Sequence, residues 1–143
     1  MMPPIENCPC TLAAGNNTYS RTGLNRLFNG KRVSHVLPFM PPQVDEEIAE
    51  KFRQNRKILS ISGVQVKQSM LLDKNHLRIT NEGEQGEYIL KPIPHRETIG
   101  NIDQLPANEH LTMQIARQVY AIDTAENGLV FFKNGEPAYL TKR

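Results

Sequence analysis

The sequence predicts an α+β domain in which a small antiparallel sheet is flanked by helices. From residue 57 onward, short apolar stretches alternate with polar residues, and each stretch is bounded by residues that favour turns. One helical pattern separates the first three stretches from the last two. The order strand, strand, strand, helix, strand, strand matches a small sheet with a flanking helix.

The first 56 residues are expected to form a leader with two short helices and one strand. Residues 1–18 carry prolines, cysteines and a Gly-Asn-Asn run, which indicates an irregular start. Ser20 can cap a helix over residues 21–29, and Gly30 can end it. Alternation over residues 32–37 then predicts a strand.

The second leader helix is predicted over residues 45–56. Asp45 can cap it, its first turn is acidic and its end is basic, as the helix dipole favours. Its apolar residues recur every fourth position, which gives one apolar stripe on an otherwise charged helix. A solvated amphipathic helix is the first interpretation, and a partner-binding face is the second. The stripe consists of Val44, Ile48 and Phe52.

Residues 57–143 are expected to form the sheet domain. Strands are predicted over residues 64–72, 77–80 and 88–91, with turns at 73–75 and 81–84. A hairpin is predicted from residues 129–133 and 138–141 around an Asn-Gly turn. Between these two groups, residues 107–120 read as a helix. Its expected buried stripe consists of Leu111, Ile115, Ala116 and Val119.

The composition of the chain argues against a membrane-spanning, a secreted or a nucleic-acid-binding protein. No apolar run approaches the roughly 20 residues of a membrane helix, and the N-terminus lacks the pattern of a signal peptide. A net charge of +2 is too small to indicate nucleic-acid binding, so a cytoplasmic protein is expected. Cys8 and Cys10 cannot complete a tetrahedral zinc site by themselves. We expect a reduced pair near a frayed terminus.

Three features together suggest a site for nucleotide phosphates. Gly63, between short residues, lets a loop approach phosphates closely. Lys91 follows an apolar run, so alternation can turn it inward with Ile89, where its ammonium needs a counter-charge. ATP phosphates or Glu109, at the start of the next helix, can supply that charge. The alternative is an ordinary turn, a surface lysine and a glutamate that serves the helix N-terminus.

The segment 60–143 resembles the amino-terminal lobe of the HipA-type serine/threonine kinases, the toxins of bacterial toxin–antitoxin pairs. Several motifs occur in the order found in that family. The Ser-x-Ser pair at its start resembles the shorter, HipT-like branch. The resemblance implies a kinase amino-terminal-lobe fold for residues 57–143. The matching pieces are SISGVQVK (60–67), YILKP (88–92), LPANEHLTMQIA (105–116) and FFKNGEPAYLTKR (131–143).

The resemblance also implies roles for single residues. Lys91 would contact the α- and β-phosphates of ATP and pair with Glu109, and the backbone of residues 140–142 would begin the hinge beside the adenine. Ser60 and Ser62 would be autophosphorylation sites, since a phosphate there would repel the phosphates of ATP. The residues expected at the nucleotide are Ser62, Gly63, Val64, Gln65, Lys67, Lys91, Glu109, Thr141 and Lys142.

The sequence lacks the second half of a kinase. HipA-type kinases hold magnesium and orient the attacking hydroxyl through an Asp-Gly-His-x-x-Asn segment and a later aspartate, which are absent here. We therefore expect a chain cut at the hinge that binds ATP weakly alone, without catalysis. Mg²⁺ would bind only through a partner lobe on a separate polypeptide. The alternatives are a regulatory module that binds an antitoxin or an intact HipA-type kinase, and a truncation without an independent task.

Overall fold

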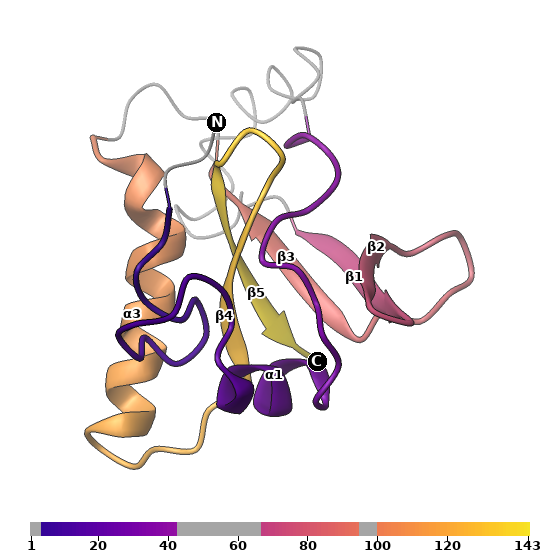
Figure 1. Cartoon of the computed structure of the whole chain (residues 1–143). Coiled ribbons are helices and arrows are strands. Elements are labelled where there is room, and N and C mark those ends of the chain that lie inside the picture. The colour runs from indigo at the N-terminus through magenta and orange to yellow at the C-terminus, as the bar shows by residue number, and fades with distance from the viewer. Residues whose placement is uncertain (1–3, 43–66, 95–99) are drawn as a thin grey trace.

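A twisted sheet of five antiparallel strands forms the centre of the molecule (Figure 1). The structure is a computed structural model, and it describes residues 4–42, 67–94 and 100–143. Within these ranges the strands lie in the order β2-β1-β3-β5-β4. Their bounds are Gln68–Asp73 (β1), His76–Ile79 (β2), Tyr88–Pro92 (β3), Asn127–Phe131 (β4) and Pro137–Lys142 (β5).

Two α-helices accompany the sheet in the described part of the chain. α1 (Arg21–Phe28) precedes the sheet, and α3 (Leu105–Gln118) lies between β3 and β4, directly after a short 3-10 helix, η2 (Ile102–Gln104). The predicted α+β class and the predicted order of three strands, a helix and two strands are confirmed. Neither α-helix is both long and apolar enough to cross a membrane.

α1 begins and ends where the sequence predicts. The Ser20 hydroxyl accepts a hydrogen bond from the Gly23 N–H at 3.1 Å, which satisfies one free donor of the first turn. Asn29 and Gly30 then adopt left-handed conformations, with φ of 53° and 81°. Residues at the two ends of α1 therefore determine where the helix begins and ends.

The two faces of the sheet are covered differently. Tyr88 and Leu90 point to one face and are buried, whereas Ile89 and Lys91 point to the other and are partly exposed. The leader, here residues 4–42, covers the first face, where the Tyr88 hydroxyl donates to the Leu27 carbonyl at 2.6 Å. We call this the leader face and the opposite one the Lys91 face. α3 packs against β4 and β5 on the Lys91 face.

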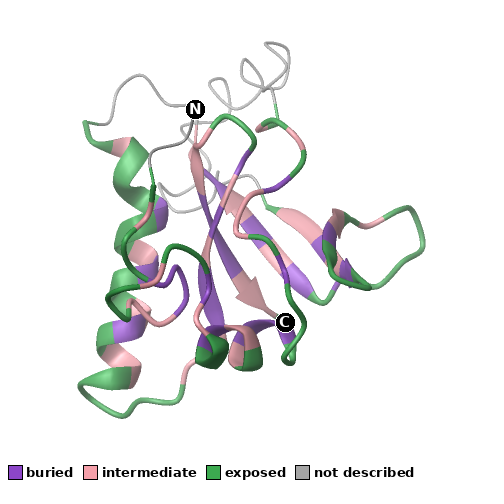
Figure 2. Ribbon diagram, viewed as in Figure 1, coloured by how far each residue is buried: buried purple, intermediate pink, exposed green. Residues whose placement is uncertain are grey.

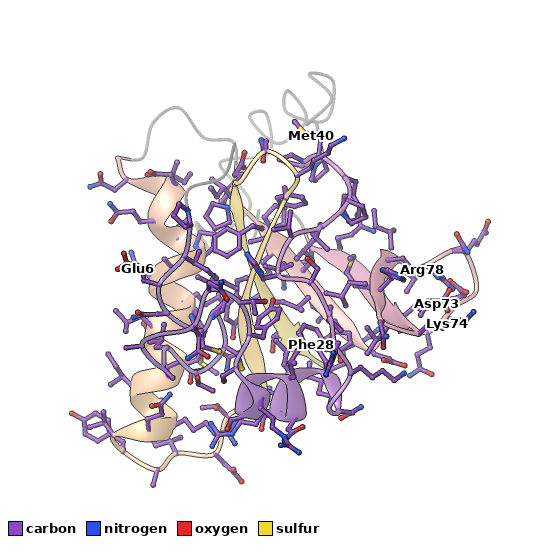
Figure 3. The ribbon with its side chains drawn as sticks, viewed as in Figure 1. Glu6, Phe28, Met40, Asp73, Lys74 and Arg78 are labelled. Carbon is purple, nitrogen blue, oxygen red and sulfur yellow. The ribbon has the colours of Figure 1, made fainter. Side chains whose placement is uncertain are left out.

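The leader and the sheet share one hydrophobic core. Phe28 (Figure 3) packs edge-on against Tyr19, with 5.1 Å between ring centroids, and lies 5.9 Å from the Tyr88 ring. The described leader residues therefore belong to the same packed unit as the sheet. Its buried members are Cys8, Cys10, Tyr19, Leu27, Phe28, Val33, Leu37, Met70, Leu72, Leu77, Tyr88, Leu90, Val130, Phe132, Ala138 and Leu140.

The strand predicted over residues 32–37 is wrong. This segment makes one isolated parallel bridge, between Val36 and Phe131 of β4. In this bridge the Leu37 N–H donates to the Phe131 carbonyl at 2.7 Å and the Phe131 N–H donates to the His35 carbonyl at 2.8 Å, while the Val36 N–H is turned away from β4 and donates to the Ser34 hydroxyl at 3.1 Å. Val33 and Leu37 are buried, a spacing of four residues rather than two. The predicted helix over residues 45–56 lies outside the described residues, as do residues 64–66 of the first predicted strand.

The expectation of a frayed terminus around the cysteines is also wrong. Cys8 and Cys10 are 0% and 2% exposed. The carbonyl of Pro9, between them, accepts a hydrogen bond from the Leu129 N–H of β4 at 2.8 Å. The N-terminal segment is thus held along the edge of the sheet. Both thiols are free, as expected.

α3 forms where predicted, but its predicted buried stripe is wrong. Leu111, Ile115 and Val119 are 47%, 42% and 70% exposed, and Ala116 is only partly buried. The helix buries His110 and Gln114 instead. In Figure 2 the outer side of α3 is mostly coloured as exposed. The helix is therefore oriented so that two polar side chains, and not its apolar stripe, face the interior of the protein.

Candidate functional site

Lys91 and Glu109 form an ion pair on the Lys91 face. The Lys91 Nζ lies 2.6 Å from Glu109 Oε1, and the two side chains keep 20% and 34% of their surface exposed. Lys91 comes from β3 and Glu109 from the first turns of α3, 18 residues later. The ammonium is therefore held by a carboxylate but still reachable from solvent. An ion pair this accessible contributes only about 1 kcal/mol to stability.

The ring of a buried tyrosine lies beneath the Lys91 ammonium. Tyr139 of β5 pairs with Lys91 in the sheet register, and its ring centroid lies 5.3 Å from the Lys91 Nζ. Such a cation–π contact orients the lysine. Burial and the nearby Glu109 carboxylate raise the pKa of Tyr139 to about 12, so its hydroxyl stays neutral.

Hydrogen bonds set the rotation of α3 about its axis. The His110 Nε2 lies 2.8 Å from the Cys10 carbonyl oxygen, and the Gln114 Nε2 donates to Asn127 Oδ1 at 3.1 Å. Both contacts are buried and directional. Because Glu109 is next to His110 on the helix, the same contacts aim Glu109 at Lys91.

The other predicted residues are placed as follows. Thr141 pairs with Ile89 and so lies on the Lys91 face, and Lys67 is exposed immediately before β1. Lys142 points to the leader face, where its Nζ donates to Asn29 Oδ1 at 2.8 Å. Its side chain is therefore directed away from Lys91. The predicted loop residues Ser60, Ser62, Gly63, Val64 and Gln65 lie outside the described residues.

The backbone at the predicted hinge is already hydrogen-bonded. The Lys142 N–H donates to the Glu126 carbonyl at 2.8 Å, and the Arg143 N–H donates to the Glu87 carbonyl at 2.9 Å. Thr141 lies in a strand that is paired on both sides. These N–H groups would have to leave their partners to contact an adenine.

The sequence did not predict that Tyr139 belongs to the candidate site. The alternation over residues 138–141 predicts a strand but not its register, and only the register places Tyr139 opposite Lys91. Ile89, on the same face, was noted only as a neighbour of Lys91. No local pattern identifies either residue as part of a site.

The cysteines form a sulfur–amide cluster. The Cys8 Sγ accepts N–H bonds from Cys10, Thr11 and Ser20 at 3.4, 3.4 and 3.2 Å. Burial alone would raise the pKa of the Cys8 thiol, but hydrogen bonds from Ser20 and Thr11 bring it below the ordinary value. Burial raises the pKa of Cys10 to about 12. Among the described residues, no three His, Cys, Asp or Glu side chains are grouped to hold a metal ion.

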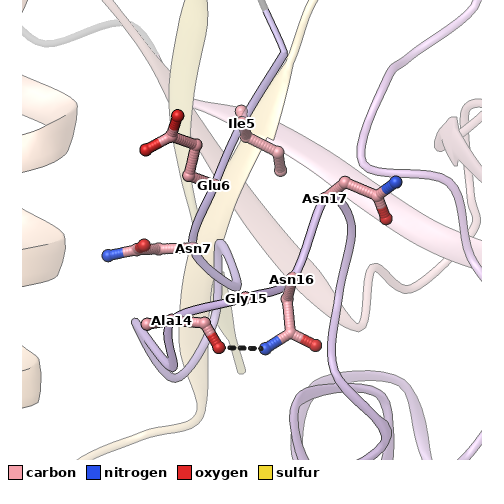
Figure 4. Close-up of a pocket in the computed structure, with 7 residues that line it drawn as sticks. All are labelled: Ile5, Glu6, Asn7, Ala14, Gly15, Asn16 and Asn17. Carbon is pink, nitrogen blue, oxygen red and sulfur yellow. Dashed lines mark hydrogen bonds between the residues drawn. The ribbon is translucent and has the colours of Figure 1, made fainter.

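One hollow in the described surface does not include Lys91 among its lining residues. It is open and is lined by the N-terminal segment (Figure 4). Its polar groups are mostly asparagine amides, and Glu6 is its one charged residue. A carboxylate with neutral amides offers no cation to a phosphate. We therefore assign the candidate site to the Lys91 face. The hollow is lined by Ile5, Glu6, Asn7, Ala14, Gly15, Asn16 and Asn17.

Comparison of the chain with protein-family models and with curated proteins gives no match.

The burial of His110 leads us to predict that the protein loses stability in mild acid. Burial lowers its pKa, so folding disfavours protonation. The free energy of unfolding should be constant above the ordinary histidine pKa of about 6.5 and fall as the pH drops toward the lowered value. Urea unfolding between pH 7.5 and 5 measures this slope. His110→Gln, which keeps an N–H donor for Cys10, should reduce the slope. An equal slope in the wild type and His110→Gln would contradict the assignment.

Proposed function

We propose that this chain holds the phosphates of ATP on its Lys91 face, as the amino-terminal lobe of a HipA-type serine/threonine kinase. The observation that carries the proposal is the ion pair between Lys91 and Glu109, at 2.6 Å. The sequence predicts this pair from a lysine at a strand end and a glutamate at the next helix start. In kinases the same two elements supply the lysine and glutamate that position the α- and β-phosphates.

The chemistry around Lys91 suits a triphosphate. Its ammonium presents a point charge with three donors, of which Glu109 and the Tyr139 ring leave part accessible. Ile89 and Leu71 are partly exposed and lie on the same face by strand alternation. They offer an apolar surface beside the charge. Phosphate and base could therefore lie on one continuous face.

Phosphoryl transfer is assigned to a second lobe. Transfer requires carboxylate and amide groups that hold magnesium and orient the acceptor hydroxyl. The 143 residues contain no Asp-Gly-His-x-x-Asn segment. We propose that a second lobe, outside these 143 residues, supplies these groups and the Mg²⁺ site, and that Ser60 and Ser62 accept phosphate in the assembled kinase.

Equilibrium titration of a fluorescent ATP analogue into the purified chain tests the proposal. Binding should be weak because one lobe covers one side of the nucleotide. Lys91→Ala should weaken it by about tenfold or more, since a charge-assisted hydrogen bond contributes roughly 1.5–3 kcal/mol. Lys133→Ala removes an exposed lysine from the β4–β5 turn and is the matched control.

Two outcomes would overturn the assignment. One is equal binding by the wild type and Lys91→Ala, with and without a co-expressed polypeptide that carries the Asp-Gly-His-x-x-Asn segment. The other is no nucleotide binding in either situation, which is the result expected of a purely regulatory module. Glu109→Gln separates the role of the carboxylate, because it removes the charge that holds the ammonium and keeps the side-chain size.

A further inference from the structure

The outer side of α1 and of the turn after it carries basic side chains and no acidic one. Residues 20–33 contain four arginines and lysines and no carboxylate. The end of β5 adds two more cations beside α1 (Figure 1), because the Lys142 Nζ donates to Asn29 Oδ1 at 2.8 Å and Arg143 follows it. We call this the basic α1 surface. It consists of Arg21, Arg26, Lys31, Arg32, Lys142 and Arg143, of which Arg26 and Lys142 are partly exposed and the others exposed.

These cations are not neutralised by carboxylates in the described part of the chain. None of the ion pairs between described residues includes a member of the basic α1 surface. Two acidic residues lie at its margin. The Glu126 carboxylate is held by Arg117 at 2.6 Å, and Glu87 contacts Arg143 through its backbone carbonyl. The net charge of +2 averages over this asymmetry, so it does not describe the potential at this surface.

The cations are spread over the surface and do not converge on one point. At about 100° per residue, Thr22 and Asn25 lie between Arg21 and Arg26 on the side of α1 opposite its buried residues. The helix is about 12 Å long, and Lys31 with the next residue continues the charge beyond its end. A single phosphate group would meet only part of this array, whereas the repeating phosphates of a nucleic acid can contact several of its members.

The neutral residues of this surface distinguish among anionic partners. Thr22, Asn25 and Asn29 are exposed, and such side chains contact phosphate and sugar oxygens in protein–DNA complexes. The large exposed apolar side chains of the described residues lie at position 40 and between positions 79 and 122, so none belongs to this surface. Protein interfaces have an apolar core and membrane-surface helices have an apolar face. The composition therefore favours a nucleic acid over an acidic protein or an anionic membrane.

We propose that the basic α1 surface binds the phosphate backbone of double-stranded nucleic acid. Proteins that bind single strands stack bases on exposed aromatic rings. The one aromatic ring in residues 20–33, that of Phe28, is fully buried, which favours a duplex. Contacts to the backbone carry no sequence preference, and each one releases counterions, so binding should weaken steeply as salt increases. Lys142 points to the leader face, so the inference is independent of the nucleotide site at Lys91.

Fluorescence anisotropy with labelled duplexes of about 20 base pairs, two turns in length, tests the proposal. DNA and RNA duplexes of mixed sequence are titrated in parallel, because both present the phosphate array, and binding of either supports the proposal. Between about 50 and 200 mM salt, four phosphate contacts would give log K against log salt a slope of about −3.6.

A double substitution separates this surface from the overall charge. Lys31→Gln with Arg32→Gln removes two exposed cations and should weaken duplex binding at low salt by at least about tenfold, with a salt slope smaller by about 2. Lys74→Gln with Lys133→Gln is the matched control, because it removes the same charge from exposed positions in two hairpin turns. The control should bind as the wild type does, and thermal unfolding checks that both variants fold.

Competition experiments test the other anionic partners. Polyglutamate and vesicles of phosphatidylserine with phosphatidylcholine are added to the bound duplex at matched concentrations of charge. Either competitor should displace the duplex less effectively than an unlabelled duplex does. Better displacement by either one would overturn the proposal, as would a lack of binding to both duplexes at low salt. Equal affinities and salt slopes in the two double variants would overturn it as well.

Discussion

Phe28→Ala should lower the free energy of unfolding by about 3–5 kcal/mol. Phe28 is fully buried and packs between Tyr19 of the leader and Tyr88 of the sheet. Its removal leaves a cavity bounded by a helix end and two ring side chains. The neighbours cannot collapse freely into this cavity, because the Tyr88 hydroxyl is held by Leu27 and the Tyr19 hydroxyl donates to the Leu129 carbonyl at 2.6 Å.

Urea unfolding monitored by circular dichroism measures this loss. Met40→Ala provides the control, because Met40 belongs to the leader but is 56% exposed; it should change stability by less than about 0.5 kcal/mol. If Phe28→Ala costs no more than Met40→Ala, the leader does not share a core with the sheet.

Gly128→Ala should destabilise the protein by about 1–3 kcal/mol through overpacking. A methyl group at Gly128 would lie 2.9 Å from Leu27 Cδ2 and 3.2 Å from the Pro9 carbonyl oxygen. The Leu27 methyl can move a little. Pro9 cannot retreat without weakening its 2.8 Å hydrogen bond from the Leu129 N–H. The expected result is a loosened contact between the N-terminal segment and β4.

Gly100→Ala is the matched control for Gly128→Ala. A methyl group at Gly100 has no atom within 4 Å, and its backbone is not left-handed. This change should be neutral or slightly stabilising, because alanine restricts the unfolded chain more than glycine does. Amide hydrogen exchange at Leu129 gives a local measure, and it should accelerate in Gly128→Ala alone. Unchanged exchange and stability in Gly128→Ala would contradict the close contact.

Features set by neighbouring residues were predictable from the sequence. Ser20 caps α1, the Asn-Gly turn joins β4 to β5, and the Lys91 and Glu109 pairing follows from a strand end and a helix start. Each of these depends on chemistry within a few residues or on one short connection. They are the features for which local patterns carry the information.

Features set by distant partners were not predictable. The burial of His110 depends on the carbonyl of Cys10, 100 residues away, and that of Gln114 on the amide of Asn127. The assumption that the apolar side of a helix is the buried side therefore predicted the wrong face of α3 to be buried. The same reasoning explains Tyr139, whose place beneath Lys91 depends on strand register. Alternation over residues 32–37 also did not predict that this segment meets β4 at a single bridge, between Val36 and Phe131.

The polar contacts beneath α3 also affect how the helix can move. Packed methyl groups tolerate small rotations of a helix with little loss of energy, but hydrogen bonds weaken steeply when their angles change. The hydrogen bonds of His110 and Gln114 therefore restrict the rotation of α3 about its axis. Gln114→Leu would remove one of these hydrogen bonds, and the helix should then sample a wider range of rotations. The Glu109 carboxylate would move with it, so the precision of the ion pair with Lys91 depends on hydrogen bonds that neither Lys91 nor Glu109 makes.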